Sequence, residues 1–253
     1  GWVCCRWAPA PTLTCSSAAS FAPAAERASA RCTTDCPPTA PPVSSSAQVA
    51  AAIAAMNADA GVHGVVLQLP LPPGLTDHFR ALVEGIAPGK DVDCLARICR
   101  AAPDDPVGPQ PCVAAAVGEM LDHYRIDVRG RRAVVTSTSF LVGAPMRRLL
   151  TARGALVDPC PQPPPALTRQ ADILVCATGT PGRFRGEDVG EGAVVFDVGI
   201  ALRPDGRVVG DVDLPSALAR GARVTPVPGG VGPATVAVLL RNLYSCYRAA
   251  GGT

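Results

Sequence analysis

Three segments of the chain combine residue types that can do chemistry with positions at the ends of elements. The first contains Gln68, whose amide both donates and accepts hydrogen bonds. It stands near the end of an apolar strand predicted over 64–69 and bounded by Pro70 and Pro72. Because an unsatisfied buried amide costs about 1–3 kcal/mol, Gln68 either closes a structural hydrogen bond or faces a cleft. Both interpretations remain open from the residues alone.

The second segment is charged. Lys90 is followed by Asp91, Val92 and Asp93, so that two carboxylates occupy alternate positions beside a base. A solvated surface loop explains such a pattern as well as a binding or catalytic site does, since exposed charge pairs are common and weak. The residues alone do not decide between the two.

The third segment is the run from Thr225 to Thr235, which contains three prolines and three glycines. Paired glycines permit positive φ and a close approach of backbone to a ligand. Pro233 suits the first turn of a helix, whose free amides can bind an anion or a polar group. A single glycine-rich turn is weak evidence for a site, but this full run is specific.

The elements that position these segments follow from apolar periodicity. Helices are predicted over 47–58, 76–86, 112–124 and 231–248, with Thr76 or Asp77 as a possible N-cap of the second. Between 133 and 226 apolar strands alternate with helical stretches, which is typical of a parallel sheet covered on both faces. The predicted strands are 133–137, 155–158, 173–177, 193–198 and 223–226, with a helix over 142–152. The predicted fold class is therefore α/β, with a doubly wound, Rossmann-like nucleotide-binding domain.

Composition bounds the class of protein. With 253 residues, 48% hydrophobic and 17% charged, the chain suits a folded globular protein. A net charge of +2 gives no argument for a nucleic-acid or membrane partner. No apolar run approaches the roughly 18 residues of a membrane span, and the start lacks the features of a signal peptide, so we expect a cytoplasmic location. Among the eleven cysteines, Cys32 and Cys36 have no second ligand pair nearby, so we expect no metal site.

Residues 1–45 differ from the rest. They are rich in Ala, Pro, Ser, Thr and Cys and show neither helical nor strand periodicity. Codons implied for the first eight residues, read in a shifted frame, encode an apolar strand ending in glycine. We therefore hypothesise that this aberrant low-complexity block is an out-of-frame translation and that the true frame resumes near Ser46.

From about Ser46 to Tyr247 the chain resembles the bifunctional methylenetetrahydrofolate dehydrogenase/cyclohydrolase family. The matching motifs are Gln-Leu-Pro-Leu-Pro at 68–72, Lys-Asp-Val-Asp at 90–93, Pro-Cys at 111–112, Ala-Asp-Ile through Gly-x-Pro-Gly at 171–182, Asp-Val-Gly-Ile at 197–200, Gly-Asp-Val-Asp at 210–213 and the run at 225–235. The chain departs at Cys94, where glycine is usual, at Val113 and Ala114, which replace Thr-Pro, and at Ala234, where methionine is usual.

The resemblance implies NADP-dependent oxidation of 5,10-methylenetetrahydrofolate, with NAD as the alternative cofactor, and hydrolysis of the methenyl product to 10-formyltetrahydrofolate. It implies a homodimer and four segments: the 1–45 block, the rest of the folate domain at 46–106, the nucleotide domain at 107–230, and a returning helix at 231–253. Gln68 and Asp93 would be catalytic, Asp93 also holding the pterin. Folate-binding residues would be Leu69, Pro70, Asp93, Pro228, Gly229 and Gly230. Cofactor-binding residues would be Ser137, Thr138, Ser139, Val142, Gly143, Ala177, Gly179, Val198, Gly199, Ile200, Gly232 and Thr235.

One departure concerns catalysis. The family has a tyrosine and, four residues later, a proton-transferring lysine before the strand at 64–69. This sequence has no lysine before Lys90, and counting back without gaps places the pair at Ser20 and Ala24. Arginine cannot replace the lysine, because its guanidinium stays protonated. We therefore expect impaired chemistry, and the rival interpretation is an inactive remnant that binds folate weakly or supports a partner subunit.

The cofactor loop departs as well. The family's Gly-x-Ser turn is Ser137-Thr138-Ser139, so a side chain stands where a glycine lets a phosphate approach. Thr138 replaces the arginine that many members use for the 2′-phosphate, and Pro161-Gln162 replaces a His-Ser pair. These changes put NADP binding in question. An unrelated NAD(P) oxidoreductase fits poorly, because the Gly-x-Gly-x-x-Gly fingerprint is absent.

Overall fold

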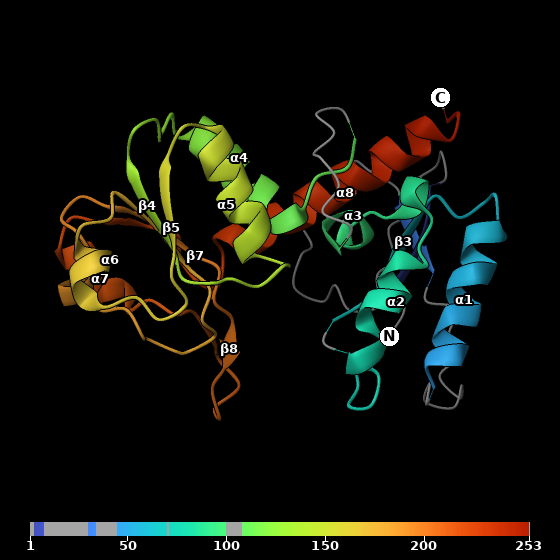
Figure 1. Cartoon of the computed structure of the whole chain (residues 1–253), viewed down its shortest axis with the longest axis horizontal. Coiled ribbons are helices and arrows are strands. Elements are labelled where there is room, and N and C mark those ends of the chain that lie inside the picture. The colour runs from blue at the N-terminus through green and yellow to red at the C-terminus, as the bar shows by residue number, and fades with distance from the viewer. Residues whose placement is uncertain (1–2, 8–29, 34–44, 70, 100–107, 253) are drawn as a thin grey trace. The chain divides into compact units, whose positions relative to one another are not determined.

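The computed structural model describes residues 3–7, 30–33, 45–69, 71–99 and 108–252 (Figure 1). Pro70, most of the 1–45 block and the stretch 100–107 lie outside the described residues. The chain forms two compact units: unit 1 comprises Gly1–Gln110 and Leu239–Thr253, and unit 2 comprises Pro111–Val238. Helix α8, Val231–Ala249, belongs to both, because the division falls within it.

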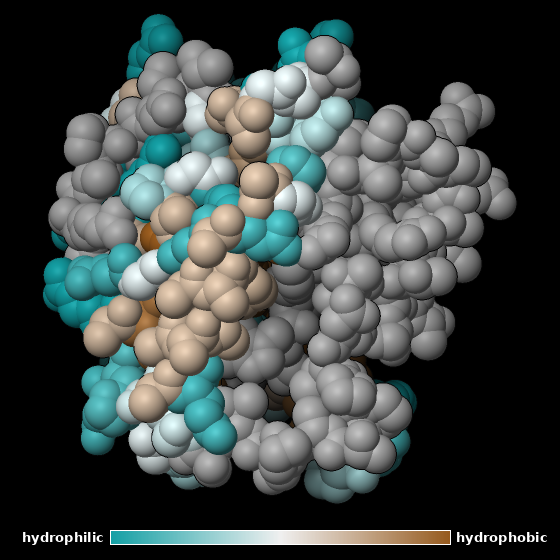
Figure 2. Space-filling model, turned by 90° about the vertical axis from the view of Figure 1, so that its right-hand side faces the viewer, coloured by the Kyte–Doolittle hydropathy of each residue, from teal (hydrophilic) through white to brown (hydrophobic). Residues whose placement is uncertain are grey.

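Unit 1 contains helix α1, Ser46–Ala58, close to the predicted 47–58. Its start is fixed by a capping box: the Ser45 hydroxyl accepts from the Gln48 amide, and the Gln48 side chain accepts from the Ser45 amide. Val49 and Ile53 are buried, whereas the outward face consists of small residues. That face is formed by alanines 47, 50, 51, 54 and 55, and Figure 2 shows weakly hydrophobic surface on the side where α1 lies in Figure 1.

Unit 1 also holds a small antiparallel sheet of order β2-β1-β3, formed by β1 (Val3–Trp7), β2 (Ala30–Thr33) and β3 (Gly64–Val66). The 1–45 block, which shows no periodicity in the sequence, contributes β1 and β2 to this sheet. Strand β1 pairs with both β2 and β3, so backbone hydrogen bonds across the sheet form these strands although the local sequence shows no strand periodicity. Strand β3 is shorter than the predicted 64–69, so Gln68 lies beyond its end.

The remaining elements of unit 1 are short. The helix predicted over 76–86 is a 3₁₀ turn η1, Thr76–His78, followed by α2, Phe79–Glu84. Neither Thr76 nor Asp77 acts as an N-cap, since the cap positions are Leu75 and His78 and carry no side-chain cap bond. A 3₁₀ turn η2, Pro88–Lys90, and helix α3, Leu95–Cys99, enclose the Asp91–Asp93 segment.

Unit 2 is built around a five-stranded, fully parallel sheet of order β10-β7-β6-β4-β5. Numbered along the chain, this order is 5-4-3-1-2, which is the doubly wound pattern with a topological switch between β4 and β6. The predicted α/β class and doubly wound sheet are confirmed. The strands are β4 (Arg132–Val135), β5 (Leu156–Pro159), β6 (Ile173–Cys176), β7 (Val194–Asp197) and β10 (Arg223–Val224).

Helix α4, Cys112–His123, precedes β4 and contacts α5, Gly143–Ala152, which connects β4 to β5 (Figure 1). Helix α6, Pro165–Arg169, the 3₁₀ turn η3, Gly186–Asp188, and helix α7, Leu214–Ala219, contact one another through η3. A separate hairpin pairs β8, Ala201–Leu202, with β9, Val208–Val209.

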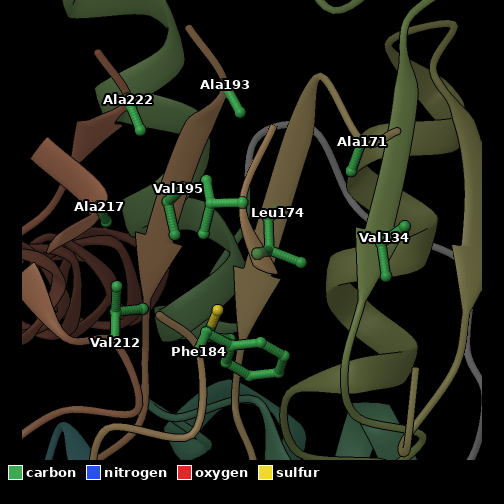
Figure 3. Close-up of a cluster of buried hydrophobic side chains, with 11 residues drawn as sticks. Val134, Ala171, Leu174, Phe184, Ala193, Val195, Val212, Ala217 and Ala222 are labelled. Carbon is green, nitrogen blue, oxygen red and sulfur yellow. The ribbon is translucent and has the colours of Figure 1, made fainter. Parts of the chain in front are cut away.

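The core of unit 2 explains why the sheet is stable. Val134, Leu174 and Val195 come from three adjacent strands and point to the same side of the sheet, where Phe184 and Ala217 join them (Figure 3). All five are at most 1% exposed. Strands buried on both faces are near-continuous apolar runs, which is why they were visible in the sequence.

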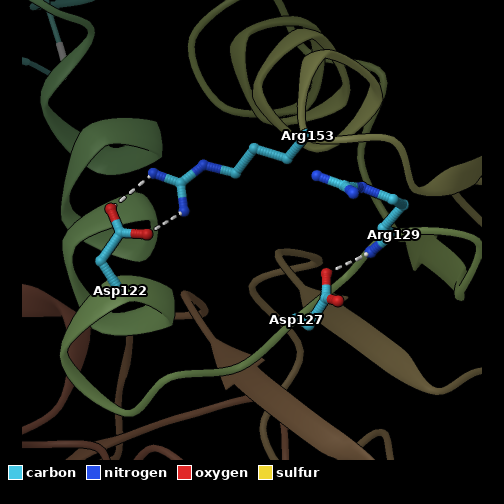
Figure 4. A network of polar contacts seen from close by, with 4 residues as sticks. All are labelled: Asp122, Asp127, Arg129 and Arg153. Atoms are coloured by element: carbon cyan, nitrogen blue, oxygen red, sulfur yellow. Dashed lines mark hydrogen bonds and ion pairs between the residues drawn. The ribbon is translucent and has the colours of Figure 1, made fainter.

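An ion pair links α4 to the end of α5. The two terminal guanidinium nitrogens of Arg153, Nη1 and Nη2, donate to the Asp122 carboxylate at 2.6 and 2.8 Å (Figure 4). The bond to Arg153 lowers the pKa of Asp122. Its side chain is 65% exposed, so the pair contributes little to stability, about 0–1 kcal/mol.

None of the helices among the described residues has the length and apolarity needed to cross a membrane. Within the same residues, no group of three or more metal-ligating side chains lies together.

Candidate functional site

The two loops at the switch point of unit 2 are joined by a hydrogen bond. The Ala177 amide donates to the Thr136 hydroxyl at 2.9 Å, and Thr136 is only 2% exposed. These residues directly follow β6 and β4, the strands between which the order reverses. In doubly wound sheets, ligands bind outside the carboxyl ends of the strands at this point.

The first loop, 136–142, is closed by its own serines. The Ser137 hydroxyl donates to Ser139 Oγ at 3.0 Å and accepts from the Ser139 amide at 3.2 Å. Ser137 is 8% exposed, so its side chain is turned into the loop, whereas Thr138 is exposed. Ser139 Oγ in turn accepts from the amides of Val142 and Gly143, at 3.2 and 3.4 Å. The Ser139 hydroxyl therefore satisfies amides at the start of α5. A phosphate that binds at this helix start must compete with that hydroxyl for these amides.

Gly143 is required by the closeness of this loop, because a Cβ there would overlap the carbonyl of Ser137. Gly143 therefore lets the turn at Ser137 pack directly against the start of α5.

The second loop follows β6. Gly179 is exposed, with φ +69°, and an added Cβ would meet nothing within 4 Å. The Gly179 amide and both the amide and hydroxyl of Thr178 donate to Asp211 Oδ2. The buried carboxylate of Asp211 therefore fixes this loop, and the backbone at Gly179 is accessible to solvent.

A third loop, 198–200, follows β7. Asp197 accepts hydrogen bonds from the amides of Gly199, Asp211 and Val212. Burial raises the pKa of Asp197, and these amides oppose that shift. Val198 is half-buried, Gly199 is buried, and Ile200 is 68% exposed.

The Pro-Gly run at 225–235 ends at the start of α8. Pro228 and Gly229 are exposed, whereas Gly230 is buried, and a Cβ at Gly230 would overlap the Pro226 carbonyl. Gly232 faces open space. The Thr235 hydroxyl donates to the Val231 carbonyl at 2.9 Å, a bond within the helix.

In unit 1, Gln68 is exposed, and its amide nitrogen donates to the carbonyl of Leu69 at 3.0 Å. The structure therefore gives Gln68 a local bond at the surface. Leu69 is half-buried.

The Asp91–Asp93 segment lies beside β3, because Asp91 forms a parallel bridge with Val65. Asp91 is 5% exposed and accepts from the amides of Leu95, Ala96 and Arg97, so it caps α3. Burial raises the pKa of Asp91 despite these bonds. Asp93, two residues further on, is half-buried. The bridge thus brings the Gln68 and Asp93 motifs together in one unit.

Lys90 directly precedes this segment, at the end of η2. Its ammonium donates to the carbonyls of Met56, Asn57 and Asp59 at 3.0, 2.8 and 2.8 Å. All three donor positions of the amine are occupied by the C-terminal end of α1.

Both halves of the chain match models of one family. Residues 111–250 match the NAD(P)-binding domain of the tetrahydrofolate dehydrogenase/cyclohydrolases, and residues 16–93 match the catalytic domain. The chain belongs to the tetrahydrofolate dehydrogenase/cyclohydrolase family. The family resemblance inferred from the motifs is thereby confirmed, and the catalytic-domain match includes part of the 1–45 block.

Relatives with the name bifunctional protein FolD agree with this family. The protein from Bordetella avium is 44% identical over 193 residues, which cover 74% of this chain and 67% of the relative. That from Xanthomonas axonopodis pv. citri is 45% identical over 203 residues, covering 78% and 66%. The chain thus spans about two thirds of the length of these relatives.

Solved structures of the family show the same fold. The Campylobacter jejuni bifunctional FolD has a TM-score of 0.73 and 36% identity, with 82% of this chain and 75% of that chain covered. The Trypanosoma brucei FolD, solved with NADP cofactor and an inhibitor, has a TM-score of 0.75 and 34% identity, with coverage of 83% and 75%.

The sequence did not reveal three side chains that hold the loops of unit 2: Thr136, Asp197 and Asp211. Asp197 and Asp211 stand in the Asp-Val-Gly-Ile and Gly-Asp-Val-Asp motifs. A charged residue at the end of a fully buried strand could have indicated Asp197, since buried carboxylates are paired or hydrogen-bonded.

Proposed function

We propose that the chain is a cytoplasmic tetrahydrofolate dehydrogenase/cyclohydrolase whose catalysis is impaired. The reactions are oxidation of 5,10-methylenetetrahydrofolate and addition of water to the methenyl product, which yields 10-formyltetrahydrofolate and releases a proton. The observation that carries the impairment is the position of Lys90, the one lysine of the sequence, whose ammonium is bound to three carbonyls of α1.

For the nucleotide we propose NADP, with NAD as the alternative. The residues fit such a group, because Gly179 and Gly232 leave open backbone and Thr138 is exposed. When bound, the nicotinamide supplies the hydride acceptor. The residues proposed to hold the cofactor are Ser137, Thr138, Ser139, Val142, Gly143, Ala177, Gly179, Val198, Gly199, Ile200, Gly232 and Thr235.

For the folate we propose that Asp93 holds the pterin and that the exposed amide of Gln68 faces the substrate. Exposure of Gln68 supports this role, since its side chain closes no buried hydrogen bond. Leu69, Pro70, Pro228, Gly229 and Gly230 are the further residues proposed to bind folate.

The missing function is proton transfer. Hydrolysis of the methenyl bridge requires removal of a proton from the attacking water, and a positioned general base contributes about 10²–10⁴-fold to such a step. Asp93 and Gln68 can bind and orient the substrate but leave this step without an amine. We therefore expect the hydrolysis to be slower than in the relatives by a factor of this size.

The experiment compares the purified chain with the Bordetella avium relative. Absorbance of reduced nicotinamide follows the oxidation with NADP or NAD, and loss of methenyl absorbance follows the hydrolysis. Activity within about tenfold of the relative would overturn the proposed impairment. A chimaera that carries the relative's N-terminal segment in place of residues 1–45 should recover activity if that block alone is at fault.

The same Lys90 contacts favour a second candidate, an inactive family member that binds folate weakly or supports a partner subunit. Equilibrium binding of tetrahydrofolate without turnover of either reaction distinguishes it from a slow enzyme. We propose an out-of-frame origin for the 1–45 block, although the catalytic-domain match that begins at residue 16 counts against it. A nucleotide sequence without an open, family-like second frame there would exclude it.

We also propose that the chain forms a homodimer through the β8–β9 hairpin. Leu202 and Val208, which pair across the hairpin, are 71% and 39% exposed, so the hairpin presents apolar side chains to solvent. Clustered exposed apolar residues mark interaction surfaces more often than scattered ones do.

A further inference from the structure

Two buried aspartates lie under the loops of unit 2. Asp197 is 3% exposed and Asp211 is 0% exposed. Asp197 ends β7, and its carboxylate accepts from the backbone amides of Asp211 and Val212 at 3.1 and 2.9 Å. Asp197 thus fixes the backbone that carries Asp211.

Asp211 then reaches a second loop. Its Oδ2 accepts from the Thr178 hydroxyl at 2.8 Å, from the Gly179 amide at 3.2 Å, and from the Thr178 amide. Hydrogen bonds to a carboxylate are roughly twice as strong as those between neutral groups. The segment that follows β6 is therefore held by one side chain located 33 residues further along the chain.

Glycines make this arrangement possible. A Cβ at Gly199 would overlap the Asp211 carboxylate, and a Cβ at Gly210 would overlap that of Asp197. Each aspartate therefore packs directly on the backbone next to the other. Asp211 Oδ1 is buried and has no hydrogen-bond partner among the described residues, so all contacts of this carboxylate with donors are made through Oδ2.

We propose that Asp211 is a positioning residue for the nicotinamide nucleotide, which fixes the Thr178–Gly179 backbone without touching the ligand itself. This inference rests on the proposed function, because it requires that unit 2 binds the nucleotide. A displaced loop lowers the affinity for the nucleotide, because backbone amides that lose the Asp211 carboxylate no longer hold the conformation that binds.

Asp213 provides a matched control in the same motif. Its carboxylate accepts from the Ser216 amide at 3.0 Å and caps α7, and the residue is exposed. The substitution D213A therefore removes a carboxylate two residues away without affecting the second loop.

The test measures the Kd of NADP and of NAD by calorimetry for the full chain and for D211A, D211N and D213A. Hydrogen exchange of the Thr178 and Gly179 amides is followed in parallel. D211A should weaken nucleotide binding roughly 10- to 100-fold and remove protection from both amides. D213A should change neither. D211N keeps an oxygen at the Oδ2 position and should fall between wild type and D211A, and it also serves if D211A does not fold.

The outcomes separate the two claims. If wild type binds neither nucleotide, the proposed function of unit 2 fails and this inference fails with it. If wild type binds and a folded D211N or D211A binds with the same affinity, the positioning role alone is wrong. Unchanged protection of the Thr178 and Gly179 amides in D211A or D211N would likewise show that Asp211 does not position this loop.

Discussion

The ammonium of Lys90 lies 2.8 Å from the carbonyl oxygen of Asn57, at the C-terminal end of α1. Two more carbonyls of the same helix end, those of Met56 and Asp59, complete its contacts. A cation at this position neutralises the negative end of the helix dipole and satisfies carbonyls that have no partner within the helix. Lys90 therefore holds α1 against the turn that precedes Asp91.

Lys90→Met should lower the free energy of unfolding by about 2 kcal/mol, because charge-assisted hydrogen bonds are removed from a half-buried helix end. Arg80→Met is the control: Arg80 pairs with Glu84 on the surface of α2, and its side chain is 70% exposed. Urea unfolding followed by circular dichroism measures both. Equal, small effects of the two substitutions would show that Lys90 does not stabilise α1.

Cys94 provides a test of backbone strain. It is 1% exposed and has φ +58°, in the left-handed region that favours glycine. Both Cys94→Gly and Cys94→Ala remove the thiol, but only glycine relieves the strain. The glycine variant should therefore be more stable than the alanine variant by about 1 kcal/mol. Thermal unfolding of the pair measures the difference, and an alanine variant as stable as the glycine variant would contradict it.

The ion pair of Asp122 and Arg153 predicts a small dependence of stability on pH. The folded pKa of Asp122 is lowered by Arg153, so its contribution is fully present above the unfolded pKa of about 4 and is lost as pH falls through the folded value. The free energy of unfolding of wild type should exceed that of Asp122→Asn by about 0.5 kcal/mol at pH 7. The difference is small because the pair is exposed. Urea unfolding at pH 7 and below pH 3 checks this: a difference that persists in acid would exclude the pair as its source.

The proposed dimer surface can be tested with a charge. Leu202→Asp places a carboxylate on the exposed face of the β8–β9 hairpin and should weaken dimerisation roughly tenfold or more. Leu218→Asp on α7 is the control, because Leu218 is 51% exposed and lies outside the hairpin. Sedimentation over a range of concentrations gives the dimer dissociation constants. A monomeric wild type, or equal effects of both variants, would remove the hairpin as the interface.

Much of unit 2 was predictable because its strands are buried on both faces. The strand predicted over 173–177 is observed as Ile173–Cys176, and the last helix, predicted over 231–248, as Val231–Ala249. Helices α6 and α7 were not predicted, because five or six residues give no clear period.

The contacts that shape the candidate site could not be predicted from the local sequence, because their partners are far apart along the chain. Lys90 and Asn57 are 33 residues apart, as are Thr178 and Asp211. Nothing in the neighbourhood of Lys90 indicates that its partner is the end of a helix. Likewise, the Ser137 side chain points into the loop because its hydroxyl bonds to Ser139. The sequence suggested that this side chain obstructs a phosphate, but it is buried.

Because the Lys90 ammonium contacts the end of α1, the chemical reactivity of this amine shows whether that contact is intact. Since the sequence contains a single lysine, an acylating reagent can modify one side-chain amine, and only when that amine has left the helix end. The rate of modification at Lys90, followed by mass spectrometry, therefore gives the frequency with which α1 detaches from the loop that carries Asp93.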